Sequence, residues 1–169
     1  ERPPATTRST SSRLFTRCTS EFTSDSFSFI SARRVRSVGC SSEFERCELI
    51  ITMLPDSKAV RAAIIGGPQE DGLSVLMGPG TILVDMSSSA PLATRELGKQ
   101  LAAKGIEMMD APVSGGVPKA CNGTLAIIVG GTQEVLECCR PVFEVMGDRI
   151  FFSGPLGSGH AVKALNNML

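Results

Sequence analysis

The sequence predicts an α/β fold, in which a mostly parallel, doubly wound Rossmann-type sheet is covered by helices and followed by the start of a long C-terminal helix. Short apolar runs rich in β-branched residues alternate with longer segments whose apolar residues recur at helical spacing. Glycines and prolines separate these segments, and of the 17 glycines only Gly39 precedes Ile65. Strands that alternate with helices favour a parallel sheet, because each crossover helix returns the chain to the same edge.

The first 34 residues differ from the rest of the chain. They are rich in Ser, Thr and Arg and contain no Lys. Two interpretations remain open: an organelle transit peptide, which is Arg- and Ser-rich and poor in acids, or a non-native start such as a wrong exon or a shifted reading frame. We expect no stable fold for much of residues 1–34, apart from a weak strand near Phe22, Phe27 and Phe29.

Regular structure is expected from about Val35 onward. The apolar run ELIITML at 48–54 ends at Pro55 and predicts a buried strand. Asp56 then stands where it can cap a helix over 57–65. The same reasoning predicts further strands at 81–85, 106–110, 124–129 and 149–152, and helices at 41–47, 91–104, 133–146 and from Ala161 onward.

Composition argues against several classes of function. Seventeen basic and seventeen acidic residues cancel, which disfavours a nucleic-acid or membrane-surface partner recruited by net charge. No apolar run approaches the ~18 residues that a membrane-spanning helix needs. The six cysteines lack CxxC spacing and the chain has a single His, so we expect no metal site. We expect all six to be reduced thiols, because disulfide frameworks belong mainly to small secreted domains.

Several candidate segments lie at the ends of the predicted strands, and ligands of parallel α/β sheets bind beyond the carboxyl ends of strands. The segment Ser114-Gly115-Gly116 is one of them. Two glycines allow backbone N–H groups to approach a ligand and to form an anion-binding nest, although a plain tight turn has the same composition. The segments at 53–55 and 87–89 lie at the same predicted edge.

The last predicted helix carries a second candidate group. Lys163 and Asn167 are four residues apart and share a helix face, so an ammonium and an amide could together protonate and orient a carbonyl oxygen. The alternative is a lysine on a solvated surface. Gly157-Ser158-Gly159 before this helix is an anion site, a site of close backbone approach or merely a loop, and His160 is interpreted as structural or substrate-neutral. Asp85 and Asp110 at strand ends are interpreted as capping or turn-closing residues.

Four motifs together resemble the β-hydroxyacid dehydrogenase family, in particular its 3-hydroxyisobutyrate dehydrogenase branch. They are ITMLPD, VDMSSSAP, DAPVSGG followed by GTLAIIVGG, and GSGHAVKALNN, and they occur in the family's order across residues 35–169. The resemblance implies hydride transfer between NAD or NADP and a small hydroxy acid. It further implies a role in valine catabolism, a homo-oligomer, and an all-helical domain after the Rossmann-type domain.

The resemblance also implies roles for individual residues. Lys163 is the general acid/base. The substrate carboxylate and the reacting oxygen are held by Ser114, Gly115, Gly116 and Asn167. The cofactor site is lined by Met53, Leu54, Pro55 and Ser88, where Ser88 stands in place of the family's usual Thr and keeps its hydroxyl.

Two features of the family are missing from this sequence. The family opens with a strand, a GxGxxG turn that binds pyrophosphate and a helix, whereas residues 1–34 contain no glycine. The all-helical domain is missing too. We therefore expect a leader at 1–34, a partial NAD(P)-binding Rossmann-type domain at 35–153 and the start of an interdomain helix at 154–169.

Two functional hypotheses follow. The first is an NAD(P)-dependent dehydrogenase of small 3-hydroxy acids; the second is a non-catalytic truncated remnant that acts at most as a weak binding module. Reduction of tartronate semialdehyde, glyoxylate or succinic semialdehyde are alternative activities, and 6-phosphogluconate is disfavoured because no phosphate-binding Arg or Lys cluster is present. The leader composition and the branch favour a mitochondrial location, with the cytoplasm as the alternative.

Overall fold

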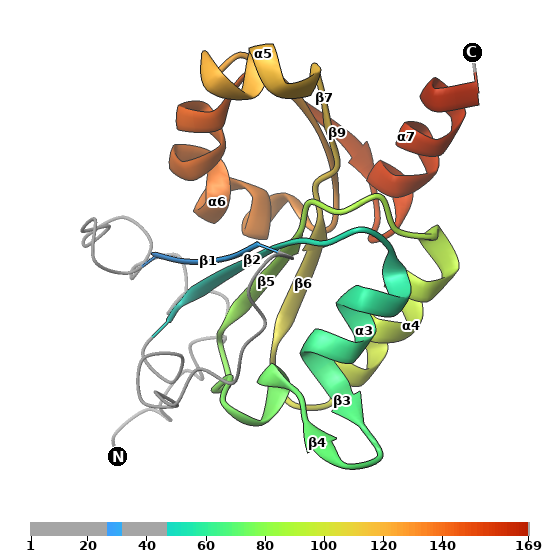
Figure 1. The fold of residues 1–169 in the computed structure, drawn as a ribbon. Helices are drawn as coiled ribbons and strands as arrows, with labels where there is room; N and C mark the ends of the chain where they lie inside the picture. Colours follow the sequence, from blue (N-terminus) through green and yellow to red (C-terminus); the bar gives the residue numbers. More distant parts are fainter. Residues whose placement is uncertain (1–26, 32–46, 169) are drawn as a thin grey trace, which may run out of the picture.

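Strands and helices alternate along the chain in a computed structural model, which describes residues 27–31 and 47–168 (Figure 1). The strands are β1 (Phe27–Ser31), β2 (Leu49–Met53), β3 (Gly66–Gly67), β4 (Glu70–Asp71), β5 (Ile82–Asp85), β6 (Glu107–Asp110), β7 (Val113–Ser114), β8 (Leu125–Gly130) and β9 (Gly147–Gly154). The helices are α3 (Ser57–Ile65), α4 (Pro91–Ala102), α5 (Gly116–Cys121), α6 (Gln133–Met146) and α7 (Ser158–Met168), with a 3₁₀ turn, η2 (Leu73–Val75).

Within the described residues, seven strands form one mixed sheet. Its order is β1-β2-β5-β6-β8-β7, and β9 pairs with β8. The strands β1, β2, β5 and β6 are parallel to one another, and β9 is parallel to β8. The strand β8 runs antiparallel to β6 and β7. The prediction of a mostly parallel α/β sheet is confirmed, while the reversal of direction at β8 was not predicted.

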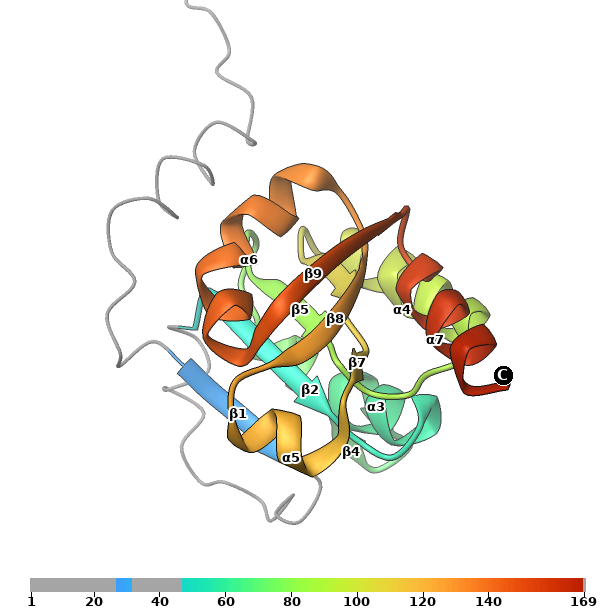
Figure 2. The same ribbon diagram turned by 90° about the horizontal axis from the view of Figure 1, so that it is seen from above.

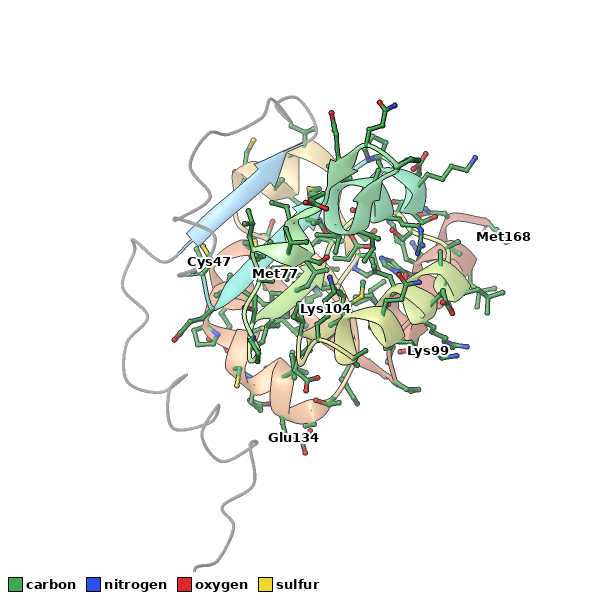
Figure 3. The ribbon with its side chains drawn as sticks, turned by 90° about the horizontal axis from the view of Figure 1, so that it is seen from below. Cys47, Met77, Lys99, Lys104, Glu134 and Met168 are labelled. Atoms are coloured by element: carbon green, nitrogen blue, oxygen red, sulfur yellow. The ribbon has the colours of Figure 1, made fainter. Side chains whose placement is uncertain are left out.

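Helices cover both faces of the sheet, and side-chain alternation along each strand divides the core in two. Ile50 and Leu83 pack with α3 and α4 on one face, whereas Leu49, Ile51 and Val84 pack with α6 on the other. Burial on both faces explains why the strands read as continuous apolar runs. The cluster under α3 and α4 also includes Cys47 and Met77, which are labelled in Figure 3.

Local signals set the helix boundaries. The Asp56 side chain accepts a hydrogen bond of 2.8 Å from the Ala59 N–H and caps α3, as predicted. Thr132 caps α6 in the same way, through Val135 N–H at 3.3 Å. Pro91 occupies the first turn of α4, where its missing N–H costs no helical hydrogen bond.

The predicted elements from 48 onward are all present, with ends shifted by a few residues. The largest shifts are at α7, which begins at Ser158 rather than Ala161, and at β9, which extends over Gly147–Gly154 rather than 149–152. The predicted strand near Phe27 exists as β1 and lies inside the segment interpreted as a leader. The helix expected at 41–47 and the Phe22 position lie outside the described residues, except for Cys47.

Candidate functional site

Buried polar side chains gather at the carboxyl ends of β2, β5 and β6. With the exceptions of Ser74 and Thr81, the buried polar residues of the described chain belong to this group, which we call the edge network: Thr52, Asp85, Ser87, Ser89, Thr94, Asp110 and His160. Each is hydrogen-bonded to another member or to the backbone of one. Throughout the described part of the chain, no buried side-chain N or O atom lacks a hydrogen-bond partner.

Asp85 fixes the loop that follows β5. Its Oδ1 accepts hydrogen bonds from the Thr52 hydroxyl and the Ser87 N–H, both at 3.0 Å. Its Oδ2 accepts one from the Ser89 hydroxyl at 2.8 Å. Ser88 lies between these two held serines and is exposed. The loop therefore presents Ser88 to solvent from a fixed backbone.

A second hydrogen bond joins the loops after β2 and β5. The Leu54 N–H donates to Ser87 Oγ at 2.8 Å. Met53 is half-buried, Leu54 is buried and Pro55 is exposed. The structure thus places the predicted cofactor residues of these two loops beside one another.

Asp110, at the end of β6, caps the first turn of α7. Its Oδ1 accepts from the Gly157 N–H at 2.6 Å and its Oδ2 from the His160 N–H at 2.7 Å. Burial raises the pKa of the Asp110 carboxyl above its ordinary value, and the two N–H donors oppose that shift. The N–H groups of Gly157 and His160 are therefore bonded to a carboxyl group of this chain.

Two glycines make this capping arrangement possible. A Cβ at Gly130, on β8, would lie 2.5 Å from Asp110 Oδ1 and 2.8 Å from Gly159 N. A Cβ at Gly159 would collide with the Ile128 carbonyl oxygen. The first turn of α7 lies directly on the end of β8 because neither position carries a side chain.

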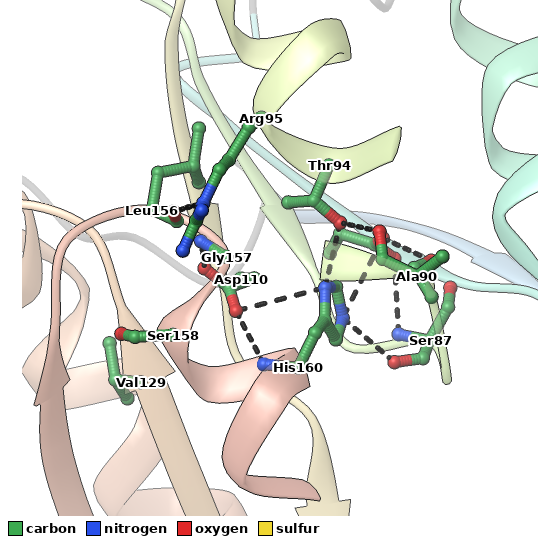
Figure 4. Close-up of polar contacts among 12 residues, drawn as sticks. Ser87, Ala90, Thr94, Arg95, Asp110, Val129, Leu156, Gly157, Ser158 and His160 are labelled. Carbon is green, nitrogen blue, oxygen red and sulfur yellow. Dashed lines mark hydrogen bonds and ion pairs between the residues drawn. The ribbon is translucent and has the colours of Figure 1, made fainter. Parts of the chain in front are cut away.

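His160 occupies the centre of the edge network (Figure 4). Its Nε2 lies 3.0 Å from the Ser87 carbonyl oxygen and its Nδ1 lies 2.8 Å from Thr94 Oγ1. Two carboxylates also face the ring, Asp85 Oδ2 at 3.9 Å from Nε2 and Asp110 Oδ2 at 3.7 Å from Nδ1. The interpretations of His160 as structural and of both aspartates as capping or turn-closing residues agree with this geometry.

The predicted catalytic and substrate residues lie on two elements that share a neighbour. Lys163 is half-buried on α7 and Asn167 is exposed one turn further along. Ser114 is half-buried at the end of β7, and Gly115 and Gly116 follow with positive φ values of 137° and 65°. Both α7 and β7 pack against β8, and Figure 2 shows α7 and α5 on different sides of β7.

Sequence reasoning missed part of this site. Thr52 and Thr94 were not singled out, although a hydroxyl inside the apolar run of β2 is a signal of a buried hydrogen bond. Helix α5 was missed because none of its residues is buried, so its sequence carries no apolar period. The sequence gives no sign that His160 joins Thr94 and Ser87, since both partners are far away in the chain.

The described residues hold no group of three or more His, Cys, Asp or Glu side chains that could bind a metal ion. None of the helices in this part of the chain is long and apolar enough to cross a membrane.

The structure is an α/β fold with a mostly parallel sheet covered by helices on both faces. Residues 17–154 match the family described as the NAD binding domain of 6-phosphogluconate dehydrogenase, and the chain belongs to that family. The match begins at residue 17, inside the segment interpreted as a leader. The recognition of a dehydrogenase of this kind from four motifs is confirmed.

Curated relatives agree with this assignment. The chain is 42% identical over 122 residues to an NAD-dependent L-serine dehydrogenase of Pseudomonas aeruginosa, which covers 72% of the chain and 40% of the relative. It is 42% identical over 134 residues to a 3-hydroxyisobutyrate dehydrogenase of the same organism, covering 78% and 44%. A human relative named mitochondrial 3-hydroxyisobutyrate dehydrogenase is 37% identical, covering 74% and 36%. The chain thus spans less than half the length of these relatives.

A solved structure shows the same fold. The Mycobacterium tuberculosis 3-hydroxyisobutyrate dehydrogenase, determined with L-serine, superposes with a TM-score of 0.68 at 32% identity. It covers 78% of this chain, which in turn covers 43% of it. The prediction of a Rossmann-type α/β fold is confirmed by this similarity.

The residues present fit an NAD-type cofactor in part. The held loops around Leu54 and Ser88 offer a fixed edge for one end of a dinucleotide. The other end needs a GxGxxG turn for its pyrophosphate, and residues 1–38 contain no glycine. The residues beside β2 and β5 therefore fit one end of such a cofactor, whereas residues 1–38 offer no glycine turn for its pyrophosphate.

Proposed function

We propose that this chain is the cofactor-binding part of an NAD(P)-dependent dehydrogenase of small 3-hydroxy acids, most similar to 3-hydroxyisobutyrate dehydrogenase. The observation that carries the proposal is the edge network, which holds the loops after β2 and β5 and the first turn of α7 as one unit. The names of the relatives support the substrate class. 3-Hydroxyisobutyrate and L-serine are both carboxylic acids with a hydroxyl on the third carbon.

An NAD-type cofactor would, when bound, supply the hydride acceptor for the carbon that carries the substrate hydroxyl. Lys163 Nζ takes the hydroxyl proton as the carbonyl forms, and returns it in the reverse direction. The Ser114 hydroxyl and the N–H groups of Gly115 and Gly116 bind the substrate carboxylate. The Asn167 amide orients the reacting oxygen.

The proposed cofactor contacts lie on the two held loops. Met53, Leu54 and Pro55 would line one side of the cofactor, and the Ser88 hydroxyl would bind it near the nicotinamide ribose. Fixed loops favour binding because their order is already established in the free protein. The missing glycine turn opposes it, so we expect weaker binding than in a chain that carries GxGxxG.

The experiment that tests this proposal is a calorimetric titration of the 169-residue chain with NADH and NADPH. Saturable binding of either cofactor supports the proposal. The lower of the two Kd values shows which cofactor the chain prefers. Absence of binding at millimolar cofactor would overturn it for this chain. That outcome would favour the alternative, a non-catalytic remnant, for which the missing glycine turn is the supporting observation.

An activity assay distinguishes the proposed role of Lys163 from that of the cofactor-binding residues. The chain is assayed with NAD⁺ or NADP⁺ and 3-hydroxyisobutyrate or L-serine, by the absorbance of reduced nicotinamide. We expect Lys163→Ala to abolish turnover and to leave the Kd for the reduced cofactor unchanged, because Lys163 acts on the substrate oxygen. Lys99→Ala, on the exposed end of α4, is the matched control. We expect it to leave both the turnover and the Kd for the reduced cofactor unchanged. Turnover that survives in Lys163→Ala would contradict the assigned role.

Substrate choice within this class is tested in the same assay run in reverse. Tartronate semialdehyde, glyoxylate and succinic semialdehyde are offered with reduced cofactor, beside the aldehyde of 3-hydroxyisobutyrate. We propose that the latter gives the highest kcat/KM. A higher value for any other aldehyde would reassign the substrate.

We propose a mitochondrial location, with the cytoplasm as the alternative. The Arg- and Ser-rich composition of residues 1–34 supports it, as does the similarity to a relative named mitochondrial. Fractionation of cells that express the tagged chain would distinguish the two compartments.

A further inference from the structure

One buried side chain connects the two halves of the proposed site. His160 is 1% exposed and lies in the first turn of α7. Its ring contacts Ser87 in the loop after β5 and Thr94 on α4, while its backbone N–H donates to Asp110 on β6 (Figure 4). A single residue therefore joins α7 to three other elements.

The hydrogen bond to Ser87 sets the chemistry that the ring must have. A carbonyl oxygen only accepts hydrogen bonds, so Nε2 carries a hydrogen and donates to the Ser87 oxygen at 3.0 Å. Thr94 Oγ1 can donate to Nδ1 or accept from it, and it also lies 3.2 Å from the Ala90 carbonyl oxygen. The Nε2 donor is thus required by the geometry, whereas Thr94 adapts to the state of Nδ1.

The carboxylates that face the ring already have other donors. Asp85 accepts from Thr52 and Ser89 side chains and from the Ser87 N–H, and Asp110 accepts from two backbone N–H groups. The ring lies 3.7–3.9 Å from both, which is too far for a hydrogen bond. Its hydrogen bonds are therefore directed at the loop and at α4.

The loop at residues 86–90, which we call the strap, carries Ser88 outward between two held serines. Lys163 follows His160 by three residues, within one turn of the same helix. The strap and α7 are separate elements, and the His160 ring crosses from one to the other through the Ser87 oxygen.

We propose that His160 is a positioning residue, which clamps the strap to α7 and so sets the placement of Ser88 relative to Lys163. The clamp stands on geometry alone. Its importance for catalysis rests on the proposed function, because that assigns Ser88 to the cofactor and Lys163 to the substrate.

The first test uses the fact that the chain contains a single His. Every histidine ring signal in a ¹⁵N NMR spectrum of the histidine-labelled chain therefore belongs to His160. We expect Nε2 to carry a hydrogen that exchanges slowly with water, because it is buried and bonded. An Nε2 without hydrogen, or one that exchanges freely, would overturn the clamp.

The second test compares two substitutions by backbone amide spectra. In His160→Gln the side-chain amide can still donate to the Ser87 oxygen, whereas His160→Leu fills the space without a donor. We expect Leu to shift the amide signals of Ser88 and Lys163 together, and Gln to restore the Ser88 signal toward its wild-type position. Equal shifts in the two variants would overturn the proposal.

Two further variants keep the test decisive where His160→Leu fails to fold. Thr94→Val removes the Nδ1 partner and leaves the Ser87 bond, so we expect it to disturb the α4 signals and to leave the slow Nε2 hydrogen. Ser74→Ala removes another buried hydroxyl, bonded to Lys104 Nζ at 2.8 Å and outside the edge network. It should leave Ser88 and Lys163 unmoved.

The third test links the clamp to the cofactor. We expect His160→Leu to weaken NADH binding by about tenfold, the order of effect of one lost buried hydrogen bond, with His160→Gln between it and wild type. Equal Kd values for the wild type, His160→Leu and His160→Gln would show that the His160 hydrogen bond does not contribute to cofactor binding. A wild-type chain that binds no NADH contradicts the proposed function, while the two NMR tests still decide the clamp.

Discussion

At the scale of single residues, Asp110 is the group on which the site depends most. It belongs to a strand, yet its two oxygens bond the N–H groups of Gly157 and His160, which lie 47 and 50 residues later at the start of α7. A carboxylate can accept a hydrogen bond at each oxygen, whereas an amide offers one acceptor and one donor. The residue type is therefore set by the two N–H groups of α7 rather than by the strand in which it lies.

The substitution Asp110→Asn tests this dependence. Its NH₂ group would face one of the two N–H donors, so we expect a loss of about 2 kcal/mol of unfolding free energy, as for a hydrogen bond to a charged group. Urea denaturation at neutral pH measures it. The exposed Asp148→Asn is the matched control and should leave the urea midpoint unchanged. An unchanged midpoint in Asp110→Asn would contradict the capping role.

The site residues differ in how far the sequence reveals them. The rule that ligands bind beyond the carboxyl ends of strands selected the segments at 53–55 and 87–89, and the family resemblance then assigned Leu54 and Ser88 to the cofactor. His160 could be interpreted as structural, but its partners could not be named, because Thr94 and Ser87 lie 66 and 73 residues away. Spacing along one helix or strand says nothing about contacts over such separations.

At the scale of elements, α6 carries an exposed ion pair with a measurable pH signature. Arg140 donates to both oxygens of Glu137 at 2.7 Å, and these hydrogen bonds lower the pKa of Glu137 to about 2. A carboxyl whose pKa is lower in the folded chain stabilises it at pH values above its ordinary 4.5. That contribution disappears as the pH falls from 4.5 to about 2.

The variant Glu137→Gln should therefore lower the urea midpoint slightly at neutral pH, and the difference should shrink as the pH falls through this window. The effect is small because the pair is exposed and screened by solvent. Glu107→Gln, another exposed carboxyl, is the control. A difference that grows on acidification would contradict the sign of the shift, which carboxyl NMR titration measures directly.

Element types were easier to predict than element partners. Helices α4 and α6 carry clear apolar periods, because each buries one face against the sheet. Strands β2 and β5 are short continuous apolar runs, because both of their faces are buried. The antiparallel placement of β8 leaves no such trace, since a buried strand has the same composition in either direction. The start of α7 was placed too late because its first turn contains two small residues that pack against β8 and no apolar side chain.

At the scale of the whole molecule, the sheet separates two cores that share only the strand backbones. Ile64 lies in the core under α3 and α4, and Ile127 in the core under α6, both fully buried. We expect Ile64→Val and Ile127→Val each to cost about 1 kcal/mol, with additive effects in the double variant to within about 0.5 kcal/mol. Urea denaturation of the four proteins measures the coupling. A larger interaction energy between the two substitutions would show that packing in one core affects the stability of the other.

The overall architecture was predictable because burial on both faces dictates the composition of every strand. What the sequence could not supply was the convergence of distant polar groups at one edge. That convergence depends on strand order, and strand order is set by packing of the whole sheet rather than by any local pattern.

The capping of α7 by Asp110 also has a kinetic consequence. Bonds that join residues 47 to 73 positions apart close long loops, and the entropy of closing them must be overcome before they contribute. A nascent chain that ends before Ser158 contains Asp110 without the N–H groups that it caps. We therefore expect the candidate site to assemble late in folding, after the strands that position its groups have paired.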